Sequence, residues 1–483
     1  MIPSVFLVLA GILLPFLGGA LVLILPRGWV KTFSQVTAFL AFLCNLLIVI
    51  DLSMRGRTAS TVELLALGRL VIFGVTVDRL SALIGMAVIL VGFLIVVYST
   101  GYLAAANREH AEHDIRRRYY FFLLMFIGSM AGLVYSSTML GMLAFFELTG
   151  VCSWGLIGYY EDAQARRSAM KAIITTQAAS LGLYLATAVF LGMTGTFQLD
   201  ALAGLPDSAK TLIFVGIMIA AWGKSAQLPF HFWLPDAMVA PTPVSAYLHA
   251  ASMVKVGVYI FARALVSAGK VPPVIGTLGA VMAIITMLYG FAMYFPQKDL
   301  KRLLAYSTIT QLSYIFLALS VSVFGSQMAF DGAVAHIFNH AFAKSLFFLV
   351  AGALSYTAGT RMIPSLGGIM QKMPLVGICF AFATLAVSGV PPFNGFFSKF
   401  TILAGGFTAA RHNPFLMAVM VIAVLETVGS FAWLFRVFGA AVNGEPSAEV
   451  AAAAPLALPM QFVLLSLAVL TLVSGIFAAA WMA

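Results

Sequence analysis

The sequence predicts an all-α polytopic membrane protein of about fourteen transmembrane helices. The first reason is composition: 62% of the 483 residues are hydrophobic and only 9% are Asp, Glu, Lys or Arg. Soluble domains carry roughly 25% charged residues, so a chain this apolar requires lipid as its solvent. The second reason is that apolar runs of about twenty residues, the length that crosses a bilayer, recur from one end of the chain to the other.

The predicted spans are separated by short polar connections. They lie near residues 3–25, 31–52, 78–103, 119–135, 138–160, 168–192, 208–227, 243–265, 273–295, 301–322, 329–356, 375–402, 413–437 and 457–481. Segment 56–77 lacks the continuous apolar character of a span and is expected to form a hairpin or a surface segment. The first run has no charged beginning and no clear cleavage site, so we expect a span there and not a removed signal.

Orientation follows from the basic residues between the spans. With the N-terminus outside, the cytoplasmic loops hold fifteen: Arg27, Lys31, Arg108, Arg116, Arg117, Arg118, Arg166, Arg167, Lys171, Lys298, Lys301, Arg302, Arg361, Lys372 and Arg436. The opposite loops hold seven: Arg55, Arg57, Arg69, Lys210, Arg263, Lys270 and Arg411. Cytoplasmic loops carry the excess of Lys and Arg in membrane proteins, so both termini are predicted to be periplasmic. The same loops explain the net charge of +10 without a nucleic-acid partner.

Two of the spans are interrupted by proline. The seventh contains Pro229 and Pro235, and the twelfth contains Pro391, Pro392 and Gly395. Proline removes a helical hydrogen bond, and irregular backbone at membrane depth is tolerated only where protein or a water-filled cavity satisfies it. Broken helices in corresponding positions of two halves indicate a binding or transport site.

The spacing of the two breaks predicts an internal repeat. They lie five spans apart, and a tandem unit with an odd number of crossings must be inverted in its second copy. We therefore predict two inverted five-helix repeats, spans four to eight and nine to thirteen, with helices seven and twelve broken. The chain is interpreted as one membrane domain, residues 1–483, made of residues 1–118 with the first three spans, 119–265 with repeat one, 273–437 with repeat two, and 457–481 with the final span.

Five ionisable residues lie deep in apolar spans, away from loops and helix ends: Glu147, Lys224, Lys255, Lys344 and Lys399. A charge at the middle of a membrane helix costs roughly 2.5–3.5 kcal/mol, so these side chains are expected to face the interior of the bundle. A lysine held away from water loses much of its proton affinity and can then release and rebind a proton. The alternative interpretation is a permanent structural ion pair between Glu147 and Lys224.

A stripe of titratable residues marks the eleventh span. His336, His340 and Lys344 are spaced four apart and cover about 12 Å of one helix face. Histidine titrates near neutral pH, which suits proton relay. An i, i+4 histidine pair also suits zinc, but no HEXXH motif and no third ligand are evident, and Cys44, Cys152 and Cys379 are scattered. The sequence therefore predicts a relay and no metal site.

Five further residues have two readings each. Lys171 is close enough to its helix end to extend toward the membrane surface, or it contributes to the site. His231 and Asp236 follow Pro229, where they take part in function or only satisfy loose backbone. His249 precedes Lys255 by six residues, so the two share a face only if the helix is broken between them. Glu426 either pairs with Lys399 or serves a neighbouring subunit.

These residues lie in segments that resemble a known family. The segments are LAFFELTG, AAWGKSAQLPFHFWLPDAM, APTPVSAYLHAASMVKVGVYIFARA, KRLLAYSTITQLSY, NHAFAKSLFFLVAGALSY and GVPPFNGFFSKF. In this order they are similar to the antiporter-like subunits shared by respiratory complex I, multisubunit cation/proton antiporters and membrane-bound NiFe hydrogenases. Within that family the chain most resembles component D of hydrogenase-4, the formate-hydrogenlyase type, nearly end to end.

The resemblance implies a role for each matched position. Glu147 corresponds to a glutamate that pairs with the lysine at Lys224, and Lys255 to a lysine that connects the two halves. The relay of the eleventh helix corresponds to His336, His340 and Lys344, and the exit residue to Lys399. Glu426 is not part of the family pattern.

The resemblance also implies a setting. The chain would be a proton-translocating subunit in a bacterial inner membrane, beside antiporter-like paralogues and other membrane subunits of a hydrogenase complex, and through them a peripheral nickel–iron and iron–sulfur arm. Redox chemistry would occur in those other subunits, so neither a cofactor nor a catalytic residue is expected here. The alternatives are a subunit of a multisubunit cation/proton antiporter or of a complex I-like NADH dehydrogenase, and a structural anchor that has lost pumping.

Overall fold

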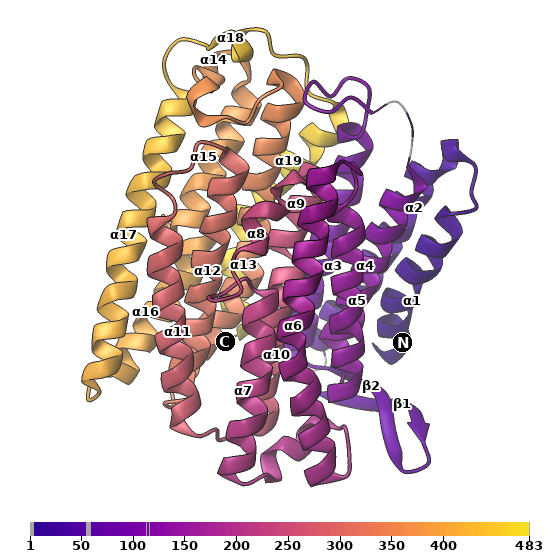
Figure 1. Ribbon diagram of the computed structural model, residues 1–483, viewed down its shortest axis with the longest axis vertical. Helices are drawn as coiled ribbons and strands as arrows, with labels where there is room; N and C mark the ends of the chain where they lie inside the picture. The colour runs from indigo at the N-terminus through magenta and orange to yellow at the C-terminus, as the bar shows by residue number, and fades with distance from the viewer. Residues whose placement is uncertain (1–3, 55–58, 113, 115, 483) are drawn as a thin grey trace.

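The computed structural model describes residues 4–54, 59–112, 114 and 116–482, and it is a bundle of long, roughly parallel helix axes (Figure 1). Arg55 and Arg57, which were counted with the loops, lie outside the described residues. In this part of the chain, twelve helices are long and apolar enough to cross a membrane. The seventh of the fourteen predicted spans is supplied by α7 (Asp207–Lys224), which carries charged residues. The twelfth is supplied by two shorter helices, α15 (Pro374–Ser388) and α16 (Asn394–Ala410).

The N-terminal part consists of α1 (Ser4–Val22), α2 (Arg27–Met54) and α3 (Arg79–Tyr102). Between α2 and α3 lies an antiparallel hairpin of β1 (Ser60–Leu67) and β2 (Leu70–Val77), in register from Ser60 opposite Val77 to Leu67 opposite Leu70, with a bulge near Leu65. The hairpin predicted for segment 56–77 is confirmed over residues 60–77.

The next elements cover the predicted first repeat. They are α4 (Arg117–Tyr135), α5 (Met139–Ile157), α6 (Ala163–Thr194), η1 (Leu199–Gly204), α7, α8 (Trp233–Asp236), η2 (Ala237–Val239), α9 (Thr242–Ala250) and α10 (Met253–Ala268). The second repeat and the C-terminal part follow. They are α11 (Pro273–Ala292), α12 (Leu300–Ser322), α13 (Gln327–Ala358), η3 (Ile363–Ser365), α14 (Ile369–Lys372), α15, α16, α17 (Pro414–Val442), α18 (Ala448–Ala451) and α19 (Leu458–Met482).

The two predicted breaks are present, and a third exists. Span seven stops at Lys224 and continues as α8, and span twelve stops at Ser388 and resumes at Asn394. Span eight, predicted as one helix over 243–265, is also divided, at Ala251–Ser252. The backbone N–H groups of both these residues donate to the carbonyl of Tyr247. No proline marks this break, so the apolar pattern alone gave no sign of it.

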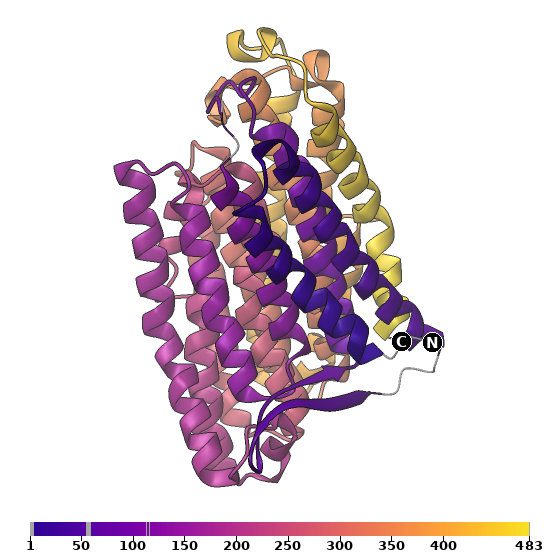
Figure 2. The same ribbon diagram turned by 90° about the vertical axis from the view of Figure 1, so that its right-hand side faces the viewer.

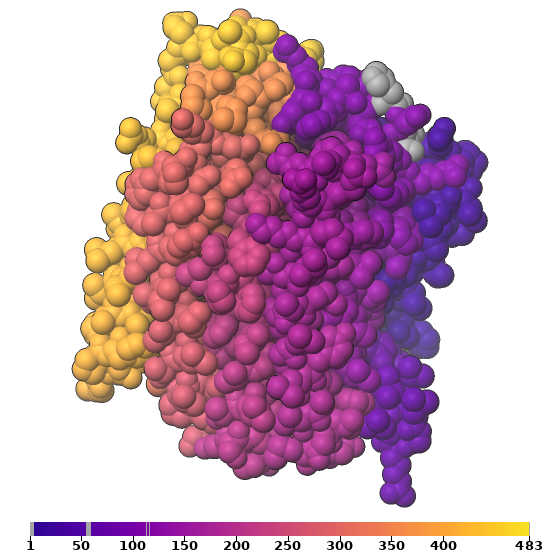
Figure 3. All heavy atoms as spheres, in the orientation of Figure 1, coloured from indigo at the N-terminus to yellow at the C-terminus, as the bar shows by residue number. Residues whose placement is uncertain are grey.

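Helices α12 and α13 form the centre of the bundle. Their most apolar stretches are buried completely, whereas α1, α2 and α17 bury only 33–39% of theirs. In Figure 3, α17 forms the edge of the molecule opposite to α1 and α2. Glycines permit close approach of the inner helices: a Cβ on Gly182 of α6 or on Gly216 of α7 would overlap the carbonyl group of the other.

Both chain ends lie in the half of the bundle that carries the hairpin (Figures 1 and 2). This arrangement agrees with an even number of crossings. Three residues that the charge count placed in loops are instead buried within helices: Lys210 at 5% exposure, Arg263 at 4% and Lys301 at 1%. Lys210 donates to the carbonyls of Ala268, the last residue of α10, and of Lys270 just beyond it. Arg263 binds Asp78, the N-cap of α3.

Candidate functional site

Lys224 and Glu147 meet at the first break. The fully buried ammonium of Lys224, the last residue of α7, donates to the carbonyl of Phe146 at 3.0 Å and to Oγ1 of Thr149 at 3.4 Å. Glu147 lies on the same turn of α5, and its two inaccessible carboxylate oxygens have no hydrogen-bond partner among the described residues. Lys224 therefore reaches the turn that carries Glu147, close enough for the charges to interact, without a direct ion pair.

Lys255 and His249 lie on opposite sides of the third break. Lys255 is 1% exposed, and its Nζ has no hydrogen-bond partner in the described part of the chain. His249 is completely buried, with both ring nitrogens unpartnered by any described residue and its ring 4.7 Å from the ring of Phe348. The division of span eight thus places two polar groups without partners beside irregular backbone.

His336 connects three inner helices. Its Nδ1 lies 2.8 Å from the hydroxyl of Ser398 on α16, and its Nε2 lies 3.3 Å from Oε1 of Gln311 on α12. The His340 ring, one turn further along α13, is 5.8 Å away between centroids. The predicted stripe is therefore turned inward, toward polar side chains of neighbouring helices.

Lys344 continues this stripe. Its buried ammonium donates to the hydroxyl of Ser307 on α12 at 2.7 Å. The positive charge of Lys255 acts on His336, His340 and Lys344, so α10 faces the stripe across the interior. Groups from the predicted first and second repeats thus meet within one buried region.

Lys399 lies near the second break, on α16. It is 3% exposed, its ammonium is 3.5 Å from the carbonyl of Ser388, and it lies over the ring of Tyr314 at 5.2 Å from the centroid. Its charge also acts on His336 and Lys344. We use the name buried row for Glu147, Lys224, Lys255, His336, His340, Lys344 and Lys399.

Three of the further candidates lie outside the buried row. Lys171 and Asp236 form an ion pair of 2.6 Å, with side chains 41% and 34% exposed, and Lys171 lies over the ring of Phe232. His231 shares a hydrogen bond of 2.9 Å with the hydroxyl of Tyr289. These residues cover the outer side of the first break. Glu426 differs from them, because it is 2% exposed and lies within the bundle on α17.

Lys301 and three polar partners were missed from the sequence. Lys301 is buried in the first turn of α12 and donates to the carbonyl of Ala240 at 2.7 Å, and its charge acts on His249. It stands beside Lys298 and Arg302 in the sequence, so the positive-inside pattern assigned it to a loop. The partners Gln311, Ser398 and Ser307 lie in apolar segments. They could have been selected from the sequence only by asking which polar residues lie on the helix faces that pack against His336, His340 and Lys344.

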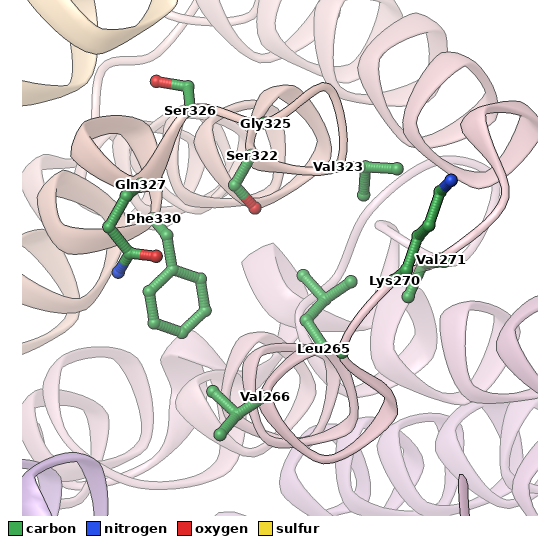
Figure 4. A pocket seen from close by; sticks show the side chains of 11 residues that line it. Leu265, Val266, Lys270, Val271, Ser322, Val323, Gly325, Ser326, Gln327 and Phe330 are labelled. Atoms are coloured by element: carbon green, nitrogen blue, oxygen red, sulfur yellow. The ribbon is translucent and has the colours of Figure 1, made fainter. Parts of the chain in front are cut away.

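Several hollows of the molecule are lined by residues outside the buried row. One of about 650 Å³ opens between the end of α10 and the connection from α12 to α13, where Lys270, Ser322, Gln327 and Phe330 surround it (Figure 4). No group of three His, Cys, Asp or Glu side chains suited to a metal is found among the described residues. The chemistry available in the buried row is proton exchange between amines, imidazoles and a carboxylate.

Fold and buried charges together define an antiporter-like membrane protein, and the comparisons with known proteins agree. The family model described as NADH:quinone oxidoreductase/Mrp antiporter, TM, matches residues 136–427. A second, described as NADH-Ubiquinone oxidoreductase (complex I), chain 5 N-terminus, matches residues 68–121. The chain belongs to this complex I and Mrp antiporter family, as a multi-pass membrane protein.

Two relatives illustrate the range of the family. The chain is 33% identical over 454 residues to a probable K(+)/H(+) antiporter component of Rhizobium meliloti, covering 91% of this chain and 44% of the relative. It is 35% identical over 419 residues to the L component of the NADH-quinone oxidoreductase of Campylobacter jejuni, covering 84% of this chain and 67% of the relative. The chain thus spans less than half of the first relative and about two thirds of the second.

Solved structures share the fold. A chain of the Mrp complex from Dietzia sp. DQ12-45-1b superimposes with a TM-score of 0.86 at 30% identity, over 99% of this chain and 52% of that one. A chain of the membrane-bound sulfane sulfur reductase, an archaeal respiratory membrane complex, gives 0.83 at 24% identity, over 99% and 95%. The second likeness concerns the fold alone.

Proposed function

We propose that this protein moves protons across the membrane along the buried row, as one subunit of a larger membrane complex. The observation that carries the proposal is the gathering of Lys224, Lys255, Lys344 and Lys399 in the bundle interior with two histidines between them. Charged groups at membrane depth are expensive and mark transport routes. Each lies at or beside a broken helix or on the central helix α13, where polar groups replace lipid.

The mechanism follows from the missing contact at the first break. Lys224 is held by a backbone carbonyl and not by the carboxylate of Glu147, so the pair is in its open arrangement. Closing the pair would favour the protonated form of Lys224, and opening it would release the proton inward. From there the proton would pass to Lys255, then to the relay of α13 and to Lys399. Alternation between the open and closed arrangements of the pair would couple a reaction or conformational change in another subunit to proton movement.

We further propose that the complex is a membrane-bound NiFe hydrogenase of the hydrogenase-4, formate-hydrogenlyase type, whose redox subunits drive this one. The support is the nearly end-to-end resemblance of segments described above. The second candidate is a role in a multisubunit cation/proton antiporter or in a complex I-like dehydrogenase. A relative named as an antiporter component, at 33% identity, and one named as an NADH-quinone oxidoreductase component, at 35%, support this second candidate as well as the resemblance supports the first.

Proton transport by purified complex in sealed vesicles tests the mechanism. Lys224→Ala and Lys399→Ala are each expected to reduce donor-driven acidification, read with a pH-sensitive dye, by about tenfold or more. Lys270→Ala and Lys372→Ala are the matched controls, because these lysines are exposed at the connections, and they should transport like wild type. Undiminished transport in both buried variants would contradict the mechanism.

Co-purification separates the two kinds of complex. A tagged chain extracted in mild detergent should bring down subunits containing nickel and iron, measured by metal analysis of the gel-filtered complex. Partners without nickel, together with cation-dependent proton exchange, would replace the hydrogenase assignment by the antiporter. A flavin-bearing, nickel-free complex that oxidises NADH would replace it by the dehydrogenase.

A further inference from the structure

Glu426 lies on the inward face of an otherwise peripheral helix. On α17 the neighbouring residues Leu425 and Val428 are 65% and 61% exposed, whereas Glu426 is 2% exposed. Ala423 and Ser430, on the same stripe, are also buried. A carboxylate placed toward the bundle and away from lipid requires a partner there.

The surroundings of Glu426 supply that partner. The hydroxyl of Ser430, one turn further on, donates to Oε1 of Glu426, while Oε2 has no hydrogen-bond partner among the described residues. The ammonium of Lys399 lies close enough for the two charges to interact, again without a direct ion pair. One carboxylate oxygen is thus fixed, and the other is free to receive a proton.

Tyr314 links the two groups. Its ring lies beneath the Lys399 ammonium, 5.2 Å from ring centroid to Nζ, and its hydroxyl bonds to the carbonyl of Ala423 and the hydroxyl of Thr427 on α17. Thr427 follows Glu426 directly. The tyrosine therefore holds α12 against α17 at the level where the lysine and the carboxylate approach one another.

We infer that Glu426 is the proton acceptor of Lys399 and completes the row at the α17 edge of the molecule. The inference rests on the proposed function and extends it by one residue that the family pattern lacks. The Lys399 ammonium gives one proton to Oε2 of Glu426, which leaves a neutral amine and a neutral carboxylic acid. Release of that proton from Glu426 restores the carboxylate, and a proton from the imidazolium form of His336, which then becomes neutral, restores the ammonium.

The deciding experiment compares Glu426→Gln with Glu426→Asp in the whole complex, in sealed vesicles with the native electron or ion donor. The glutamine keeps the shape and the Ser430 contact but cannot accept a proton, so transport should fall by about tenfold or more. The aspartate keeps the acid and should retain a substantial part of the rate, with an altered pH profile. Glu445→Gln, on the exposed connection after α17, should match wild type.

Each outcome decides between the alternatives. Wild-type transport in Glu426→Gln, with Lys399→Ala inactive, would overturn the role of Glu426 and leave the proposed function standing. Wild-type transport in Lys224→Ala and Lys399→Ala would instead overturn the proposed function itself. If Glu426→Gln fails to assemble, Glu426→Asp still decides: it moves the carboxyl back by one methylene, so an unchanged rate and pH profile in an assembled complex would contradict proton exchange at this position.

Discussion

The first and second breaks bring a lysine near a mid-helix carboxylate in different ways. At the first, Lys224 is anchored to the backbone of α5, and the carboxylate of Glu147 has no hydrogen bond among the described residues. At the second, the lysine is loosely held, at 3.5 Å from a carbonyl, and the carboxylate of Glu426 is fixed by Ser430. The mobile partner is thus the acid in one region and the amine in the other.

Burial explains what this difference means. Glu147 is only partly buried as a residue although its carboxylate oxygens are inaccessible, whereas Glu426 is 2% exposed. A partly buried acid lies close to the surface of its own chain, so a neighbouring protein in the complex could act on its charge. An enclosed acid responds only to groups within the chain. On the proposed mechanism, the first break would receive a signal from the complex and the second would deliver a proton.

The largest effect is expected from filling the second break. In Gly395→Ala the new Cβ would overlap the carbonyl of Ala386 across the break, and backbone cannot yield as a side chain does. Overpacking of this kind costs about 3 kcal/mol, so thermal unfolding in detergent should shift clearly downward. Gly192→Ala is the control, because nothing lies within 4 Å of its new Cβ, and it should unfold like wild type.

Gly150→Ala applies the same change at the first break, with a different result. Its Cβ would lie 2.9 Å from Nζ of Lys224, the far end of a flexible side chain. The ammonium can move aside, so the fold should hold while the lysine is displaced from its anchor. We expect a several-fold change in proton transport at an unchanged unfolding temperature. An unfolding temperature lowered as far as in Gly395→Ala would remove the distinction between the two regions.

Ser430→Ala and Thr149→Val compare the two holding contacts directly. Loss of the Ser430 hydrogen bond should cost about 1 kcal/mol, which corresponds to a several-fold slower transport. The Thr149 contact with Lys224 is long, at 3.4 Å, and its loss should change the rate less. Rates are read from dye quenching in vesicles. A larger effect for Thr149→Val would reverse the assignment of the fixed and mobile partners.

The smallest effect is expected at the outer side of the first break. Lys171 and Asp236 form a half-exposed ion pair, and exposed pairs contribute about 0–1 kcal/mol. Asp236→Asn should therefore leave transport and unfolding temperature near the wild-type values, more closely so at high salt. A loss of transport as large as that of Lys399→Ala would instead mean that the Lys171–Asp236 pair belongs to the proton path and that water reaches the first break.

Much of the fold was accessible from the sequence because lipid imposes simple requirements. Apolar length located the spans, and proline located the breaks at Lys224 and Ser388. The relay was visible because α13 is a regular helix, so that residues four apart share a face. These are local properties of the chain, so they can be predicted without knowing which distant segments pack against each helix.

What the sequence concealed depends on neighbours. Lys301 and Arg263 were counted with the loops because they lie near the ends of predicted spans, and they are buried because Ala240 and Asp78 from distant segments receive them. The break at Ala251–Ser252 has no proline, and it exists because the Tyr247 carbonyl takes two backbone donors. The contact of Lys224 with the Phe146 carbonyl, in place of the Glu147 carboxylate, likewise depends on local geometry that residue types alone do not specify.

The unbroken course of α13 has a mechanical consequence. Its 32 residues carry His336, His340 and Lys344 through a close-packed interior, between two spans that are interrupted. Dense packing resists compression, so the relay groups keep their distances while segments on either side are able to bend. On the proposed mechanism, a disturbance at one break would cross the molecule as a redistribution of charge along a rigid helix.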